Sequence, residues 1–161
     1  MKIKELKVGS EIEYTGELIV MRDAAQKRTK TILEGNLPLP FDLEGKIVFY
    51  AGPAKAPEGR NIGSIGPTTS SRMDSYLEML LNLGVIATVG KGRRNDFVRE
   101  LCKKYSAVYF IAPSGAAAAL SQRIISSKII AFHDLGPEAV YRLKVKNFPL
   151  IVAIDSDGNC L

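Results

Sequence analysis

Four hydroxyl side chains stand directly before an arginine in the segment GPTTSSRMD, residues 66–74. The hydroxyls belong to residues 68–71, and the arginine is Arg72. Hydroxyl groups, a guanidinium and the free N–H groups of a helix N-terminus all donate hydrogen bonds to negatively charged groups. The segment therefore predicts an anion site. The simpler interpretation is a surface turn whose Ser or Thr caps the helix indicated by the apolar residues from Met73 to Leu81, and we expect such a cap in either case.

Two other basic residues occupy comparable places in the chain. Arg22 precedes a predicted helix as Arg72 does, and Lys91 lies between the glycines of GKG, where backbone N–H groups can approach an anion. Two arginines can hold the two carboxylates of a dicarboxylate through bidentate hydrogen bonds. The alternative is that both arginines form structural ion pairs, with Asp23 and Asp74 as their partners.

Other kinds of site have weaker support. The segment GKGRRN lacks the glycine spacing and the Ser or Thr of a nucleotide P-loop, and no GxGxxG is present, so ATP and dinucleotides are disfavoured. The single histidine, His133, has no Ser or Cys partner in the order of a catalytic triad. Cys102 and Cys160 lack metal-ligand spacing, which predicts a reduced core thiol, a thiol near the end of the chain and no metal site.

The composition predicts one globular domain over residues 1–161. The chain has 161 residues, of which 46% are hydrophobic, and a net charge of +5 from 22 Lys and Arg against 17 Asp and Glu. No tryptophan is present, and the aromatic residues are not interleaved with basic ones, which disfavours nucleic-acid binding. The sequence begins without an apolar signal region and has no segment of membrane-spanning length, so we expect a cytoplasmic protein.

Apolar periodicity and turn residues predict an alternation of strands and helices. The expected elements are a hairpin around Gly16 in 10–20, a helix in 21–35, a strand in 46–52, a helix ending near 83, a strand in 85–90, a helix in 96–105, a strand in 107–113, a turn and helix in 114–124, and three strands in 128–155. Asp23 is the expected N-cap of the first helix. The order predicts an α/β fold, a single mixed domain with a parallel core and flanking strands that pair antiparallel.

In a parallel sheet the carboxyl ends of the strands lie at one edge. The turns IGPTTSSR, GKG and PSGAAA each follow a predicted strand or the long loop after one, so we expect them to converge there and share a ligand.

Taken together, these motifs are similar to a known family. The segments AGPAKAPEGRNIGSIGPTTSSRMDSY, GKG, SGAAAAL, GPEAVYRLKV and FPLIVAIDSDGN resemble the C-terminal domain of class I fumarases, which is also the β subunit of two-subunit fumarases and of L(+)-tartrate dehydratase. The resemblance covers nearly the whole chain. It implies a swivelling β/β/α fold and an iron–sulfur hydro-lyase that hydrates fumarate to malate, or alternatively dehydrates tartrate to oxaloacetate.

The resemblance also implies a cofactor, a partner and site residues. The [4Fe–4S] cluster of the family is bound by the other domain or subunit, so this chain is expected to be a β subunit that needs a cluster-bearing α subunit in a hetero-oligomer. Arg22, Thr68, Thr69, Arg72 and Lys91 are the implied dicarboxylate-binding residues. Thr68 and Lys91 are the implied catalytic residues, with Thr68 in the position of the base. A stand-alone module that binds a small anion without catalysis is the competing hypothesis.

Two points stay open at the level of the sequence. An unperturbed threonine hydroxyl is too weak an acid to supply much alkoxide at neutral pH, so Thr68 needs strong stabilisation by neighbouring cations or must relay the proton to another group. Gln26 stands where many relatives have histidine, and Ser71 and Ser114 also depart from the common pattern. We expect such differences to affect the choice between fumarate and tartrate, which the sequence leaves undecided.

Overall fold

The computed structural model describes residues 2–53, 65–112 and 120–161, in which strands and helices alternate through the middle of the chain. The strands are β1 (Glu11–Val20), β2 (Ile47–Phe49), β3 (Ala51–Pro53), β4 (Ile65–Pro67), β5 (Ala87–Gly90), β6 (Val108–Ile111), β7 (Ile124–Ala131) and β8 (Val140–Ile154). The helices are α1 (Asp23–Glu34), α2 (Leu77–Asn82) and α3 (Phe97–Tyr105), with the short 3₁₀ helices η1 (Ile3–Glu5), η2 (Ser70–Tyr76) and η3 (His133–Glu138).

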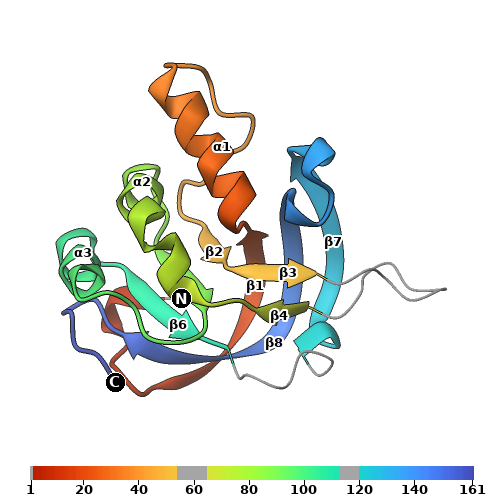
Figure 1. Cartoon of the computed structure of the whole chain (residues 1–161). Helices are drawn as coiled ribbons and strands as arrows, with labels where there is room; N and C mark the ends of the chain where they lie inside the picture. Colours follow the sequence, from red (N-terminus) through yellow and green to blue (C-terminus); the bar gives the residue numbers. More distant parts are fainter. Residues whose placement is uncertain (1, 54–64, 113–119) are drawn as a thin grey trace.

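Four parallel strands and one long antiparallel strand close into a ring. β1, β2, β5 and β6 pair in parallel in that order, and β8 pairs antiparallel with both β6 and β1. β7 pairs with the first part of β8, and β3 and β4 form a separate two-stranded ribbon (Figure 1). This arrangement confirms the predicted single mixed α/β fold with a parallel core and antiparallel flanks.

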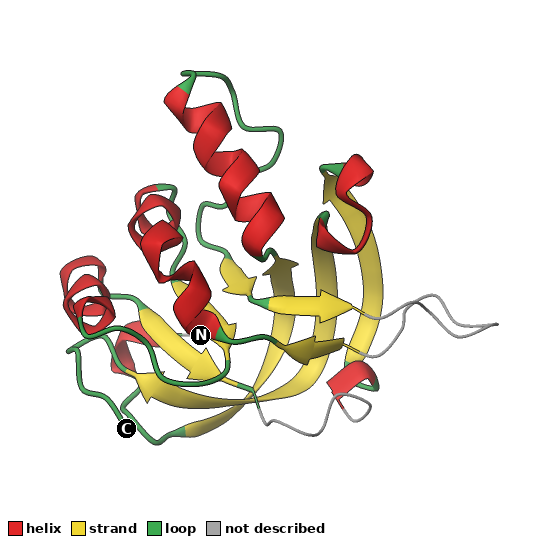
Figure 2. Cartoon of the chain, viewed as in Figure 1, coloured by secondary structure: helices red, strands yellow, loops and turns green. Residues whose placement is uncertain are grey.

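The parallel strands are buried on both faces, which explains their continuous apolar runs. Leu18 and Val20 of β1 point into the core inside the ring, and Ile19 points to the layer beneath the helices. Figure 2 shows the three α-helices on the same side of the sheet. The helices cover one face of the parallel strands. The carboxyl ends of these strands are contacted by the segment that follows β4 and by the turn that follows β5.

The predicted hairpin around Gly16 is wrong. Residues 11–20 form one strand, because β8 is long enough to pair with both halves of it. The register shift opposite Gly16 lies on β8, where Asn147 has a φ of +53° and its N–H donates to Thr15 Oγ1 at 3.0 Å. The turn-forming Asn147 thus makes a bulge, and the two strands predicted at the end of the chain are one.

Other boundaries differ in smaller ways. The helix predicted from Met73 begins as the 3₁₀ helix η2 and becomes α-helical only at Leu77. Asp23 is the first residue of α1 and does not cap it, since Arg22 occupies the N-cap position without a side-chain hydrogen bond. Most of the segment predicted as a turn and helix in 114–124 lies outside the described residues. No helix in the described ranges is long and apolar enough to cross a membrane.

Candidate functional site

The predicted site residues gather at the carboxyl edge of the parallel strands. Arg22 comes shortly after β1, Gly52 shortly after β2, and Lys91 directly after β5. The GPTTSSR segment comes from the ribbon and crosses this edge, so two of the three predicted turns do converge. The third turn, PSGAAA, lies outside the described residues.

The hydroxyl segment is joined to the Lys91 turn by backbone hydrogen bonds. The N–H of Lys91 donates to the Thr68 carbonyl at 3.3 Å, and the N–H of Ser70 donates to the Lys91 carbonyl at 3.0 Å. Thr69 and Lys91 form a parallel β-bridge, and the N–H of Thr68 donates to the Tyr50 carbonyl at 2.8 Å. Residues 68–70 therefore hold the Lys91 backbone in a fixed place, with the Thr69 and Lys91 side chains exposed.

Arg72 lies over the hydroxyl segment and contacts the first helix. Its Nη2 donates to Thr68 Oγ1 at 2.7 Å and lies 3.3 Å from Asp23 Oδ2, while about half of its side chain remains exposed. The predicted alternative partner, Asp74, is 2% exposed and pairs with Arg94 instead. The proposed pairing of Arg72 with Asp74 is therefore wrong, because Asp74 points into the protein and away from the edge.

Arg22 occupies a slot made by two other segments. Its Nε lies 3.6 Å from Glu138 Oε1 in η3, so Glu138 and not Asp23 is its ionic partner. A Cβ built on Gly52 would lie 2.5 Å from Arg22 Nη1 and 2.8 Å from Cζ, which shows that the guanidinium lies directly against the glycine. Arg22 is linked to the rest of the site through Asp23, the next residue, which pairs with Arg72.

The expected helix cap is absent. Thr69 is in the N-cap position of η2 but makes no side-chain cap hydrogen bond. The Thr68 hydroxyl accepts from Arg72, and Ser70 Oγ lies 2.8 Å from the Tyr109 hydroxyl. The Thr68 and Ser70 hydroxyls therefore contact other side chains instead of capping the helix.

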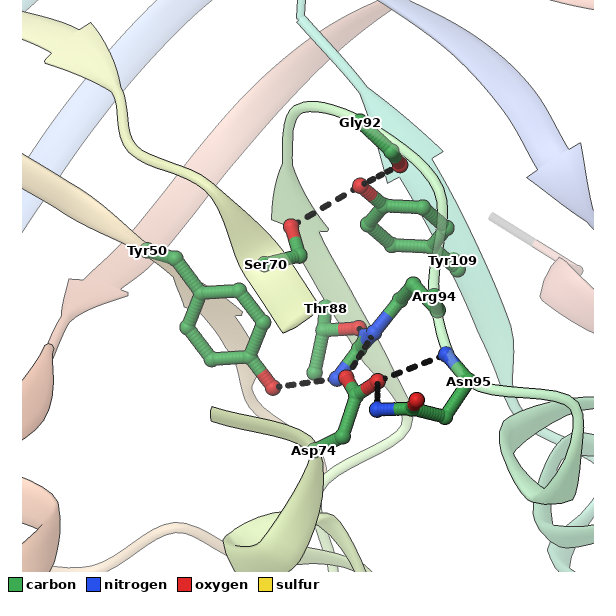
Figure 3. A network of polar contacts seen from close by, with 8 residues as sticks. All are labelled: Tyr50, Ser70, Asp74, Thr88, Gly92, Arg94, Asn95 and Tyr109. Carbon is green, nitrogen blue, oxygen red and sulfur yellow. Dashed lines mark hydrogen bonds and ion pairs between the residues drawn. The ribbon is translucent and has the colours of Figure 1, made fainter. Parts of the chain in front are cut away.

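A buried arginine beneath this edge is the main feature that sequence reasoning missed (Figure 3). The Arg94 side chain is 0% exposed and donates to three residues: Nε to Asp74 Oδ1 at 2.6 Å, Nη1 to Thr88 Oγ1 at 2.9 Å, and Nη2 to the Tyr50 hydroxyl at 3.2 Å. Its guanidinium also lies 5.1 Å and 4.8 Å from the ring centroids of Tyr50 and Tyr109. Every nitrogen of the guanidinium is therefore occupied, so Arg94 is not free to bind a substrate.

The same network joins the two segments that carry the site residues. Asp74 Oδ2 accepts hydrogen bonds from the backbone N–H and the side-chain amide of Asn95, both at 2.8 Å. Tyr109 donates its single hydroxyl proton to the Gly92 carbonyl at 2.9 Å, so Ser70 is the donor in its contact with Tyr109 (Figure 3). The network thus fixes η2 against the turn that follows β5.

Burial sets the ionisation of this network. Burial raises the pKa of Tyr109 to about 12 and also raises the pKa of Tyr50, so both phenols stay neutral. Burial alone would lower the pKa of Arg94, but the Asp74 carboxylate and the hydrogen bond to the neutral Tyr50 hydroxyl outweigh that effect and raise it. Arg94 therefore stays charged. The motifs GKGRRN and RMD contain Arg94 and Asp74, but nothing in either motif indicates that the two pair across 20 residues of sequence.

The edge offers donors for a negatively charged ligand. Thr69 and Lys91 are exposed, and Arg72 uses only Nη2 for its contacts with Thr68 and Asp23. Within the described residues, no three His, Cys, Asp or Glu side chains gather as a metal site requires. Cys102 is buried and Cys160 is exposed, and both are free thiols, as predicted.

Fold and site together describe an α/β domain with cationic and hydroxyl side chains at the carboxyl edge of its parallel strands, and comparison with known proteins assigns its family. The family model described as "Fumarase C-terminus" matches residues 1–161. The chain belongs to this family, which confirms the resemblance drawn from its motifs.

Named relatives fall into two groups. The chain is 38% identical over 160 residues to "Fumarate hydratase 2" of Leishmania major, and 35% identical over 160 residues to "Fumarate hydratase class I, anaerobic" of Escherichia coli. Each alignment covers 98% of this chain but only 28% and 29% of those relatives. The chain is also 37% identical over 164 residues to "L(+)-tartrate dehydratase subunit beta" of E. coli, with 99% of this chain and 80% of the relative covered. The chain therefore spans less than a third of the fumarate hydratases and most of the tartrate dehydratase subunit.

Proposed function

We propose that this chain is the dicarboxylate-binding β subunit of a hydro-lyase that hydrates fumarate to malate. The observation that carries the proposal is the contact of Arg72 with the Thr68 hydroxyl, beside the backbone-paired Lys91. Both groups of relatives are named as enzymes of dicarboxylic acids. The proposed role follows from this likeness together with the donors at the edge.

Arg72 and Lys91 would hold one carboxylate of the substrate, with the exposed Thr69 hydroxyl as a further donor. The guanidinium keeps Nε and Nη1 for a carboxylate while Nη2 stays on Thr68. Arg22 would bind the second carboxylate from its slot against Gly52. Two cationic positions separated in this way favour a dicarboxylate over a monocarboxylate.

Thr68 is the proposed base at the substrate carbon. Its Oγ1 already accepts a hydrogen bond from a guanidinium at 2.7 Å, and such a bond stabilises negative charge on the oxygen. The nearby Lys91 would add to this stabilisation. In the direction from malate to fumarate, Thr68 would take the proton from the substrate carbon and pass it to solvent or to a group of the partner; in hydration the proton would return to the carbon through Thr68.

The iron–sulfur cluster implied by the resemblance does not fit the residues described here. Cys102 is a single thiol buried in the core, and no three His, Cys, Asp or Glu side chains gather as a metal site among the described residues. We propose that the [4Fe–4S] cluster is held by an α subunit, with which this chain forms a cytoplasmic hetero-oligomer. The name of the tartrate relative, "subunit beta", supports a partner subunit that differs from this chain. The swivelling β/β/α fold type is proposed on the same resemblance.

Tartrate dehydration is the second candidate. It is favoured by the coverage, since the chain spans 80% of the tartrate dehydratase subunit. Gln26, a departure from the common pattern, is fully buried on α1, and its Nε2 lies 3.5 Å from the Met21 carbonyl. It can therefore influence the substrate only through neighbours such as Arg22.

The test is co-expression with a candidate α subunit, anaerobic purification and measurement of turnover with fumarate, malate and tartrate. The proposal expects fumarate and malate turnover that requires both subunits and is lost in Thr68→Ala and Arg72→Ala. Turnover of tartrate alone would favour the second candidate. Binding of dicarboxylates without turnover of any of them would support the non-catalytic anion-binding module.

A further inference from the structure

Glu138 is a charged residue of the GPEAV motif that the proposed function leaves without a role. It lies at the end of η3, between β7 and β8, and about a third of its side chain is exposed. Its Oε1 is 3.6 Å from Arg22 Nε and 3.5 Å from the backbone N of Ala24, in the first turn of α1. One carboxylate oxygen therefore faces both Arg22 and the start of the helix that follows it.

The segment that carries Glu138 is firmly attached to α1. Arg28 of α1 donates two hydrogen bonds to Asp134 of η3, at 2.7 Å and 2.8 Å, and lies 5.1 Å from the Phe132 ring centroid. The hydroxyl of Tyr141 donates to the Gly136 carbonyl at 2.9 Å, which fixes the turn just before Glu138. Glu138 thus contacts Arg22 from η3, a segment that is held by Arg28 of α1 and by Tyr141 of β8.

Apart from Glu138, the Arg22 guanidinium has few contacts among the described residues that could fix its orientation. Its Nε is buried and has no hydrogen-bond partner among the described residues, so the Glu138 carboxylate is the negative group that faces it. On its other side the guanidinium lies against the backbone of Gly52. Without Glu138, the guanidinium would keep the Gly52 surface but lose the charge that sets its rotation.

We propose that Glu138 is a positioning residue for Arg22, which it holds against Gly52 so that the Nη groups face the second carboxylate of the substrate. This inference rests on the proposed function for the identity of the ligand. The contact of Glu138 with Arg22 itself does not depend on that function. Glu138 is not a catalytic residue in this proposal, because it acts through Arg22.

The charges at this edge predict different effects on rate and on affinity when Glu138 is replaced. Three cationic residues, Arg22, Arg72 and Lys91, share the edge with two paired carboxylates, Asp23 and Glu138. Removing the Glu138 charge leaves Arg22 less well oriented but makes the site more positive toward a dianion. A variant without this charge should therefore lose rate without losing affinity.

The test compares Glu138→Gln with Asp134→Asn in the assembled complex. Asp134→Asn is the matched control, since it removes a negative charge from the same 3₁₀ helix at a residue that pairs with Arg28. Glu138→Gln should lower kcat by about five- to tenfold, because a partly exposed ion pair is lost and the carboxylate-binding group is misplaced. KM should stay unchanged or fall in Glu138→Gln. Asp134→Asn keeps one oxygen that can accept a hydrogen bond from Arg28, so it should lower kcat much less than Glu138→Gln does. An unchanged kcat in Glu138→Gln, or a raised KM with normal kcat, would overturn the proposal.

A second measurement is independent of activity. In the isolated chain, the NMR signal of the Arg22 Nε–H, assigned with Arg22→Lys, should shift and exchange faster with water in Glu138→Gln, and change much less in Asp134→Asn. A signal that is the same in wild type and Glu138→Gln would show that Glu138 does not hold Arg22. If the wild-type complex turns over no dicarboxylate while the signal does respond, the proposed function fails and the Glu138–Arg22 contact stands.

Discussion

Replacement of Arg72 by lysine tests the anion-binding edge most directly. The arginine uses one nitrogen, Nη2, for Thr68 Oγ1 at 2.7 Å and Asp23 Oδ2 at 3.3 Å, and it has two more nitrogens for a carboxylate. Lysine keeps the charge but has a single ammonium group, which cannot serve the hydroxyl and both oxygens of a carboxylate in the same geometry.

The expected size of the effect follows from the bonds that are lost. A hydrogen bond to a charged group is worth roughly 1.5–3 kcal/mol, so losing one should lower kcat/KM by roughly 10- to 150-fold. Stability should change little, because the Arg72–Asp23 pair is about half exposed and such pairs contribute at most about 1 kcal/mol. That corresponds to a fall in Tm of no more than roughly 2–4 °C for a chain of this size.

The assay measures Tm and kcat/KM on the same preparation of Arg72→Lys, with Asp23→Asn as the control. Asp23→Asn removes the ion pair but leaves the hydrogen bond from Arg72 to Thr68, so it should cost much less in kcat/KM than Arg72→Lys. The reasoning would be refuted by an Arg72→Lys enzyme that is destabilised but kinetically normal. In that case Arg72 would serve only to hold α1 against η2.

Three further predictions concern the buried network, the two thiols and the Arg22 slot. Arg94→Ala should lower the free energy of unfolding by about 3–5 kcal/mol in urea denaturation, because it leaves the Asp74 carboxylate buried without its cation, and Arg94→Met combined with Asp74→Leu should recover most of this loss. Burial raises the pKa of the Cys102 thiol to about 11, so near pH 8 iodoacetamide should modify Cys160 and spare Cys102 until the chain is unfolded, as mass spectrometry can show. Gly52→Ala should lower kcat/KM by about tenfold or more with little change in Tm, since its methyl group would occupy the place of the Arg22 guanidinium, which we propose binds substrate; unchanged kinetics would contradict this role of the arginine.

The local sequence pattern was sufficient to predict most helices and strands. It was insufficient to predict how far the two long strands, β1 and β8, extend. The apolar runs that became β2, β5 and β6, and the amphipathic stretches that became α1 and α3, have strong periodicities that tertiary contacts reinforce. Gly16 and Asn147 are typical turn residues, and the sequence alone predicted a hairpin around Gly16 and two separate strands where β8 is one. The opposing strand supplies hydrogen bonds along the whole length of each segment, which converts the expected turns into a single register shift.

In the candidate site, too, the sequence predicted some features and the tertiary structure decided others. The residue types of the GPTTSSR and GKG segments, together with the α/β order, were enough to predict that Thr68, Arg72 and Lys91 would meet at one edge of a sheet. They could not predict the partners, because a charged side chain pairs with whichever opposite charge the fold brings near it.

The sequence by itself determined the family, the order of strands and helices and the residue types available for binding an anion. These follow from local periodicity and from unusual motifs, which are properties of neighbouring residues. Only the tertiary structure decided that Asp74 faces the buried Arg94, that Arg72 contacts Asp23, and that Glu138 reaches Arg22. Each of these pairs joins segments distant in sequence, and its geometry depends on how the closed ring of strands places their ends.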